Sequence, residues 1–331
     1  MPLEKIDYSM RLEPPSLDLY RRGWTPAPGV ELGGMWVSGI VTDSSGQDYL
    51  ALRGWGDFIR GTTHTVSPFC GFRAIEKRLD GEPPHLFSEY ATHDWFEPYQ
   101  HRDSAGSVEI AYDSGSFTRD AEGCHWWDAD GRWELHGPTI SQVFIVHVPR
   151  QDGIDHEVYY RHELVKAHGT INGIAVEGHL HQDYAFGPPG TTYTDLPIAR
   201  HLEGMWVSWV SEQADGELGG GCFWQGRDGL PFGPGYLLRD GKTTVHGDFA
   251  TDVTLNSDGK ITALRVSVDG EVLDFTLTSV AGPLHVLGRL TAAPSGKPLK
   301  DSWCWIEYPA GMLTPEILDM MNERYHVAWG R

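Results

Sequence analysis

The sequence has few cysteines and few basic residues for its length, and each shortage narrows the classes of protein to which it can belong. Its four cysteines, Cys70, Cys124, Cys222 and Cys304, are far apart in 331 residues and form no C-x-x-C pair. Such spacing is typical of reduced thiols in a cytoplasmic protein. The 26 basic residues are outnumbered by 46 acidic ones, which gives a net charge of −20. A strongly acidic surface repels phosphate backbones, so the composition argues against a nucleic-acid partner.

Long apolar runs are also missing. The first twenty residues contain no apolar stretch of signal-peptide length, and no segment approaches the roughly 18 apolar residues of a membrane helix. We therefore expect a cytoplasmic protein without membrane insertion. The glycine-rich run "GELGGGC" (216–222) lacks the lysine of a phosphate-binding loop, and no G-x-S-x-G elbow occurs. These absences argue against a nucleotide site and against a serine hydrolase of that kind, and we expect no cofactor.

Aromatic residues and turn formers are abundant: 13 Trp, 13 Tyr, 12 Phe, 40 Gly and 21 Pro. Short runs that alternate apolar and polar residues recur along the chain, separated by turn signals. Asp-Gly pairs at 130–131, 240–241, 258–259 and 269–270 lie between such runs. Asp-Gly supplies the positive φ angles of tight hairpin turns. This pattern predicts an all-β fold of barrels or sandwiches.

One pentapeptide, Gly-Met-Trp-Val-Ser, occurs twice, at 34–38 and again at 204–208. Its repetition predicts that the two copies mark the same strand in two related tandem β-domains. We expect an extended lead-in over 1–30, an N-terminal β-domain over 31–175 and a C-terminal β-domain over 176–331. A short helix is expected at about 314–325, because Thr314 can cap it and Pro315 suits its first position.

The segment at the predicted junction, "NGIAVEGHLHQDYAFGPPG" (172–190), carries the strongest signal for chemistry. Alternate residues of a strand share a face, so the ionisable residues at 177, 179, 181 and 183 are expected to point one way. Three interpretations are open. His179 and His181 could bind a metal with Asp183 as a third ligand, the face could perform acid–base catalysis, or its residues could be structural, with Asp183 capping a turn.

We favour acid–base catalysis without a metal. Asp183 is then the acid or base, His181 and His179 tune its proton affinity or relay protons, and Tyr184 orients the substrate or donates a hydrogen bond. Aromatic residues of both halves are expected to line the substrate site, with Gln225 as a polar orienter and His93 and Asp94 contributing from the first half. For the aromatic residues the alternative is core packing. The expected aromatic lining consists of Trp36, Trp206, Trp209, Trp224 and Phe186.

The stretch "HQDYAFG" (181–187) resembles the Asp-His-x-Trp-Gly signature of the AttH-like proteins related to carotenoid 1,2-hydratase (hydroxyneurosporene synthase). Asp183 and Gly187 match the signature, whereas Tyr184 replaces its usual His and Phe186 its Trp. The resemblance extends over "GGMWVSGIVTDSSG", "MWVSWVSEQADGELGGGCFWQGRDG" and "GPGYLLRDG". It implies two tandem lipocalin-like β-domains and, by the chemistry of that family, addition of water to an isoprenoid double bond.

The expected function is therefore that of a cofactor-independent enzyme acting on a hydrophobic small molecule, such as a terpenoid, polyene or steroid-like compound. Hydratase or lyase, isomerase and cyclase chemistry all begin with one acid in an apolar pocket, where aromatic faces stabilise positive charge. The alternative is a non-catalytic carrier of a hydrophobic ligand. The sequence is also compatible with a homodimer.

Overall fold

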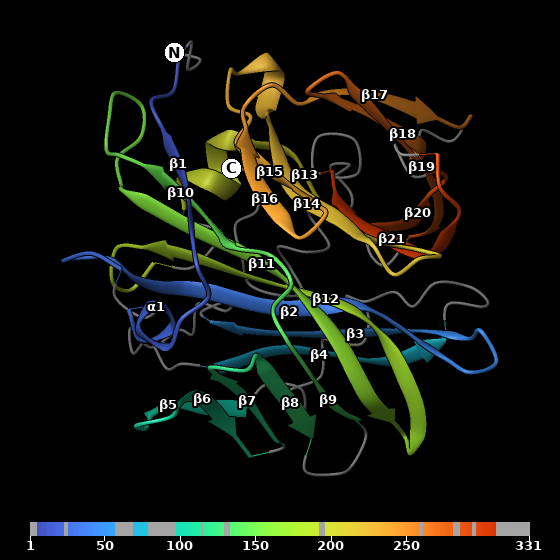
Figure 1. The fold of residues 1–331 in the computed structure, drawn as a ribbon. Coiled ribbons are helices and arrows are strands. Elements are labelled where there is room, and N and C mark those ends of the chain that lie inside the picture. Colours follow the sequence, from blue (N-terminus) through green and yellow to red (C-terminus); the bar gives the residue numbers. More distant parts are fainter. Residues whose placement is uncertain are drawn as a thin grey trace.

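Two curled antiparallel sheets make up the described part of the chain and lie against each other (Figure 1). The structure is a computed structural model that describes residues 5–22, 26–56, 69–78, 97–113, 115–128, 133–191, 196–257, 261–280, 285–292 and 296–308. The all-β fold predicted from the sequence is confirmed. Among the described residues, no helix has the length and apolar character needed to span a membrane.

The first sheet has twelve strands in the order β1-β10-β11-β12-β2-β3-β4-β5-β6-β7-β8-β9, and β9 also pairs with β11. That extra pairing closes a barrel of ten strands. β9 pairs with residues 168–171 of β11, whereas β10 pairs with residues 158–162 of the same strand and β1 pairs with β10. The strands are β1 (Ser9–Glu13), β2 (Glu31–Asp43), β3 (Asp48–Gly56), β4 (Phe69–Arg78), β5 (Glu97–Asp103), β6 (Ser107–Tyr112), β7 (Gly115–Asp120), β8 (Cys124–Asp128), β9 (Trp133–Gly137), β10 (Val143–Val148), β11 (Val158–Ile171) and β12 (Ile174–Gly187).

The second sheet has nine strands in the order β16-β15-β14-β13-β21-β20-β19-β18-β17. These are β13 (Glu203–Gln213), β14 (Leu218–Gly226), β15 (Gly235–Arg239), β16 (Lys242–His246), β17 (Ala250–Leu255), β18 (Ile261–Val268), β19 (Glu271–Val280), β20 (His285–Leu290) and β21 (Leu299–Glu307). Short helical segments occur at α1 (Leu17–Arg21), η3 (Ile198–Leu202) and η4 (Arg227–Gly229).

Two of the predicted Asp-Gly hairpins are confirmed. Asp240 and Gly241 join β15 to β16 with φ angles of 51° and 70°. Asp269 and Gly270 join β18 to β19 with φ angles of 51° and 75°. Both residues of each turn are in the left-handed region, as two-residue hairpin loops of the mirror-image type require. The pairs at 130–131 and 258–259 lie outside the described residues.

The repeated pentapeptide begins the same kind of strand in each sheet. β2 pairs with the following strand β3 and with β12, the last strand of its sheet in chain order. β13 likewise pairs with β14 and with β21, the last described strand of the chain. In both copies Met and Val are buried inside the sheet's own core, and Trp lies against the core shared by the two sheets. The two copies therefore occupy equivalent positions in their sheets, and their side chains face corresponding cores, as a duplication predicts.

The expected boundaries need correction at two places. The division at 175–176 falls within β12, which pairs with β11 and β2 and belongs entirely to the first sheet. The chain passes to the second sheet between Gly187 and Glu203. The lead-in over 1–30 is not wholly extended, because Ser16 caps the short helix α1. The helix expected at 314–325 lies outside the described residues. That each sheet forms a separate domain stays a proposal.

The described residues form three large apolar cores and a small cluster of Leu19, Val143 and Ile145. One fills the first barrel, one lies within the second sheet, and the third lies between the two sheets. The layer between the sheets takes residues from β10, β11 and β12 on one side and from β13, β14, β15 and β21 on the other. Consecutive residues of β12 and β13 thus serve different cores. Within the described part of the chain, the layer between the sheets is the one core of the three to which both strands contribute.

Candidate active site

The strand β12 turns the face that bears His179, His181 and Asp183 toward the second sheet. Val176 and Leu180 are buried in the core of the first barrel. On the opposite face, the ring of His181 lies 5.2 Å from that of Trp206 and 5.4 Å from that of Trp303. His179 and Asp183 share this face because they are two residues away on either side. The face therefore looks into the aromatic layer between the sheets.

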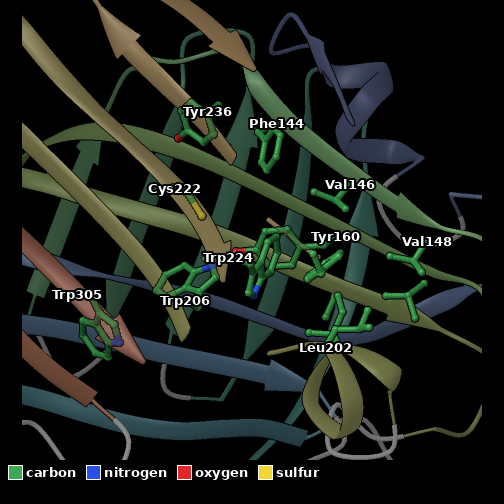
Figure 2. Close-up of a cluster of buried hydrophobic side chains, with 14 of the residues drawn as sticks. Phe144, Val146, Val148, Tyr160, Leu202, Trp206, Cys222, Trp224, Tyr236 and Trp305 are labelled. Carbon is green, nitrogen blue, oxygen red and sulfur yellow. Dashed lines mark hydrogen bonds between the residues drawn. The ribbon is translucent and has the colours of Figure 1, made fainter. Parts of the chain in front are cut away.

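His181 is enclosed by aromatic rings and one hydroxyl group. Trp305 is its third tryptophan neighbour, with ring centroids 5.7 Å apart. Its Nε2 is hydrogen-bonded to the Oγ of Ser38, which lies directly opposite on β2. Only 2% of His181 is exposed. Figure 2 shows Trp206, Trp305 and other aromatic side chains gathered in this layer.

A second histidine, His162 of β11, belongs to the site and was not predicted. It lies opposite Asp183 in the β11–β12 pairing and is fully buried. Its Nδ1 is 2.9 Å from the hydroxyl of Tyr236, and its Nε2 is 3.1 Å from the Oγ of Ser208. Burial, with a contribution from nearby His181, lowers the pKa of His162 well below its usual value. His162 is therefore neutral at physiological pH.

Asp183 is the acidic group of this layer. Burial raises its pKa well above the usual value, and Glu307 and Glu203 add to the rise, while a hydrogen bond from Tyr160 opposes it. The carboxyl group is therefore protonated at a higher pH than an exposed aspartate. Asp183 nevertheless remains partly exposed, and so does Trp36, its direct partner on β2.

Tyr160 connects the acid to the aromatic wall. Trp206 donates a hydrogen bond from Nε1 to the Tyr160 hydroxyl, at 3.0 Å. The Tyr160 ring packs edge-on against Trp224, with centroids 4.1 Å apart. Figure 2 shows Tyr160, Trp206 and Trp224 side by side. Of the predicted lining residues, Trp36, Trp206 and Trp224 thus lie in the same layer as Asp183.

His179 lies at the charged edge of the layer rather than beside Asp183. Its Nε2 is 3.9 Å from the carboxylate of Glu212, which is also contacted by Lys166 and Lys300. Burial lowers the pKa of His179 to about 4 even though Asp301 and Glu212 favour its charged form. Glu177, farther along the same face, forms an ion pair with Lys300 at 3.4 Å. His179 is thus separated from the carboxyl group that it was expected to tune.

Other predicted residues lie elsewhere, and their assignment to one site with Asp183 needs correction. Tyr184 and Phe186 lie on the face of β12 opposite to Asp183 and are buried inside the first barrel. Trp209 lies on the face of β13 opposite to Trp206 and packs inside the second sheet against Phe223 and Phe275. The side chain of Gln225 is exposed and accepts a hydrogen bond from Thr251. His93 and Asp94 lie outside the described residues.

The metal interpretation requires three or more ligand side chains grouped around one point. Within the described ranges, no three His, Cys, Asp or Glu residues are grouped as ligands of a metal ion. The Nε2 atoms of His162 and His181 are instead hydrogen-bonded to serine hydroxyls. Of the cysteines, Cys124, Cys222 and Cys304 are buried free thiols.

Comparison with known proteins gives matches to solved structures alone. No family model matches the sequence, and no curated protein matches it. A protein described as an AttH from Nitrosomonas europaea is 13% identical, with a TM-score of 0.45, over 85% of this chain and 92% of that one. Kievitone hydratase from Nectria haematococca is 8% identical, with a TM-score of 0.34, over 84% of this chain and 89% of that one.

Proposed function

We propose that this protein is a cofactor-independent acid–base enzyme of the hydratase or lyase type, that its substrate is a hydrophobic small molecule, and that Asp183 transfers the proton. The observation that carries the proposal is the position of Asp183. Its carboxyl group has a raised pKa, lies beside a wall of tryptophans and keeps partial access to solvent. A general acid for work near neutral pH needs these properties.

The proposed hydration begins with the protonated carboxyl group of Asp183. It gives its proton to one carbon of a C=C bond, whose π electrons form the new C–H bond and leave a cation on the other carbon. The faces of Trp206, Trp305 and Trp36 stabilise that charge. Water then adds to the cation through a lone pair, and the proton that it loses returns to the Asp183 carboxylate. The reverse sequence is dehydration, and isomerisation or cyclisation shares the first step.

The two buried histidines have supporting roles in this proposal. His162 remains neutral, so it does not form an ion pair that would ionise Asp183. It lies opposite Asp183, and the His181 ring is 5.5 Å from its own. Both rings are fixed by serine hydroxyls of the repeated pentapeptide. They are thus placed to orient the attacking water or to relay its proton.

The test is turnover of a panel of isoprenoid, polyene and steroid alkenes by the parent chain and by Asp183→Asn. We expect product from at least one alkene and a loss of about 10²- to 10⁴-fold in the variant, the usual contribution of a general acid. Circular dichroism checks that the variant is folded. Full turnover by a folded Asp183→Asn would overturn the assignment. The carrier alternative predicts no turnover and an unaltered ligand in native mass spectrometry of protein from its own host.

A further inference from the structure

The interior of the first barrel contains charged groups that the proposed reaction does not use. Arg119 and Arg161 are 2% and 4% exposed, and Glu163 is fully buried. All three lie on strand faces that point into the barrel, alternating with residues that point away from it. A buried charge is stable only when it is paired and hydrogen-bonded. The partners of these groups therefore indicate what the interior can bind.

Arg119 and Glu163 form an ion pair that uses only part of each side chain. Arg119 Nη2 is 2.6 Å from Glu163 Oε2 and 2.7 Å from the Oγ1 of Thr139. The hydroxyl of Tyr20 on α1 also donates to Glu163, at 2.8 Å. Within the described ranges, Arg119 Nε and Nη1 have no hydrogen-bond partner, although both are buried. Two guanidinium donors thus remain available inside the barrel.

Arg161 has no described carboxylate within ion-pair distance. Its Nη1 donates to the backbone oxygen of Leu19 at 2.9 Å, and its guanidinium lies 5.1 Å from the Phe186 ring centroid. Burial lowers the pKa of Arg161 to about 10. Burial disfavours the charged guanidinium, and the carboxylates of Glu13 and Glu163 offset this effect only in part.

Tyr184 faces inward directly opposite Arg161 in the β11–β12 pairing. Its hydroxyl accepts a hydrogen bond from Gln182 Nε2, which leaves the phenol proton to be donated elsewhere. The same row continues across the sheet through Met35 of β2 and Trp55 of β3, both buried. The row therefore begins with a guanidinium and a phenol and continues with the apolar side chains of Met35 and Trp55.

The number of strands in the first barrel bears on whether its interior can hold a ligand. Its ring has ten strands. Barrel diameter grows with strand number, and an eight-stranded barrel is already just wide enough to be filled by side chains or to hold one small ligand. The aromatic side chains of Trp55, Phe117 and Trp126 contribute to its apolar core.

We propose that the first barrel binds an amphipathic carboxylate. Its anionic head would lie between Arg161, Tyr184 and the unused edge of Arg119, and its apolar body would lie along Met35 and Trp55. A carboxylate supplies the negative charge that Arg161 lacks and accepts hydrogen bonds from guanidinium groups in the geometry that they prefer. This site is distinct from the Asp183 site, because Tyr184 and Asp183 lie on opposite faces of β12.

The test is isothermal titration of the full chain with decanoate and, separately, with 1-decanol, which has the same apolar body without the charge. We expect decanoate to bind at one site per chain. Arg161→Gln is expected to weaken decanoate at least tenfold and to change 1-decanol binding less than twofold. Tyr184→Phe, which removes one hydroxyl, should weaken decanoate about threefold or more and decides the matter if Arg161→Gln does not fold.

A matched control lies on the same strand. Asp183→Asn alters the other face of β12 and should leave decanoate affinity unchanged. A result in which Asp183→Asn weakens decanoate as much as Tyr184→Phe would place the ligand between the sheets and overturn the proposal. Failure of the parent chain to bind decanoate, or equal affinity in the folded Arg161→Gln variant, would overturn it too. None of these results depends on turnover, so the enzymatic proposal stands or fails separately.

Discussion

The Oγ of Ser208 lies 3.1 Å from Nε2 of His162, so a serine of the second sheet provides the hydrogen-bond partner of a buried histidine in the first. The other copy of the pentapeptide makes a similar contact within the first sheet, because Ser38 of β2 is hydrogen-bonded to His181 of β12. The last residue of each repeat thus reaches one of the two histidines in the layer between the sheets. The repeated pentapeptide therefore forms equivalent strands in the two sheets and also supplies the hydroxyl groups that contact His181 and His162.

Replacing Ser208 by Ala should lower the free energy of unfolding by about 1–3 kcal/mol, because it leaves a buried imidazole nitrogen without its partner. Urea unfolding at pH 7 measures the change. The exposed Ser44 is a control whose replacement by Ala should change stability by no more than about 0.5 kcal/mol. An equally small change at Ser208 would mean that the hydrogen bond with His162 contributes nothing.

Asp183→Asn should become progressively more stable than the parent chain as the pH rises above about 4. The pKa of Asp183 is raised in the folded state. The parent therefore loses stability above the unfolded pKa of about 3.9, until the folded group also ionises. Asn does not titrate, so the difference between the two proteins should grow across that window. Urea unfolding at several pH values checks this, and a constant difference would contradict the raised pKa.

Tyr160→Phe should raise the pKa of Asp183 further, because the hydrogen bond from Tyr160 lowers it. NMR titration of ¹³C-labelled aspartate carboxyl groups measures the pKa directly. The descending limb of kcat/KM at high pH should move upward with it, since the acid form then persists to higher pH. A pKa that falls in the variant would show that the Tyr160 hydroxyl does not stabilise the carboxylate.

His179→Gln should reduce the loss of stability that acid causes between pH 6.5 and pH 4. The pKa of His179 is lowered to about 4 by burial. Below pH 6.5 the unfolded chain therefore takes up a proton that the folded chain does not, and stability falls. The full shift corresponds to on the order of 3 kcal/mol. Unfolding free energies of the parent and the variant at both pH values test this, and parallel pH dependences would contradict it.

Glu163→Gln should destabilise the first barrel by about 3–5 kcal/mol, because it leaves Arg119 as a buried cation without its carboxylate partner. Adding Arg119→Met to this variant should recover part of the loss, since it removes the unpaired charge. Urea unfolding of the two single variants and the double variant measures the coupling. Strictly additive losses would show that the two side chains do not stabilise each other.

The sequence predicted those features that depend on local pattern. Alternation along 176–183 gave the faces of β12, and Asp-Gly pairs gave two hairpins. It could not show that consecutive residues serve two different cores. Tyr184 and Trp209 were therefore grouped with Asp183 and Trp206, although alternation itself places them on the other face. His162 was missed because it meets Asp183 only through the pairing of β11 with β12, which is a contact across the chain.

The boundary expected at 175–176 falls inside β12 for a related reason. The ionisable segment was interpreted as a junction, yet β12 closes the first sheet by pairing with β2 more than a hundred positions earlier. Pairing between distant strands is a tertiary property that composition and turn signals do not encode. The sequence did not indicate the charged groups inside the first barrel either, because Arg119 and Glu163 lie 44 positions apart.

The hydrogen bond between Ser208 of the second sheet and His162 of the first bears on how separable the two halves are. A fragment that stops at Gly187 would present His162 and its apolar neighbours to water without Ser208 and Tyr236. A fragment that begins at Glu203 would present Trp206, Trp303 and Trp305 uncovered. Each half therefore covers an apolar face that the other half would otherwise leave open to water.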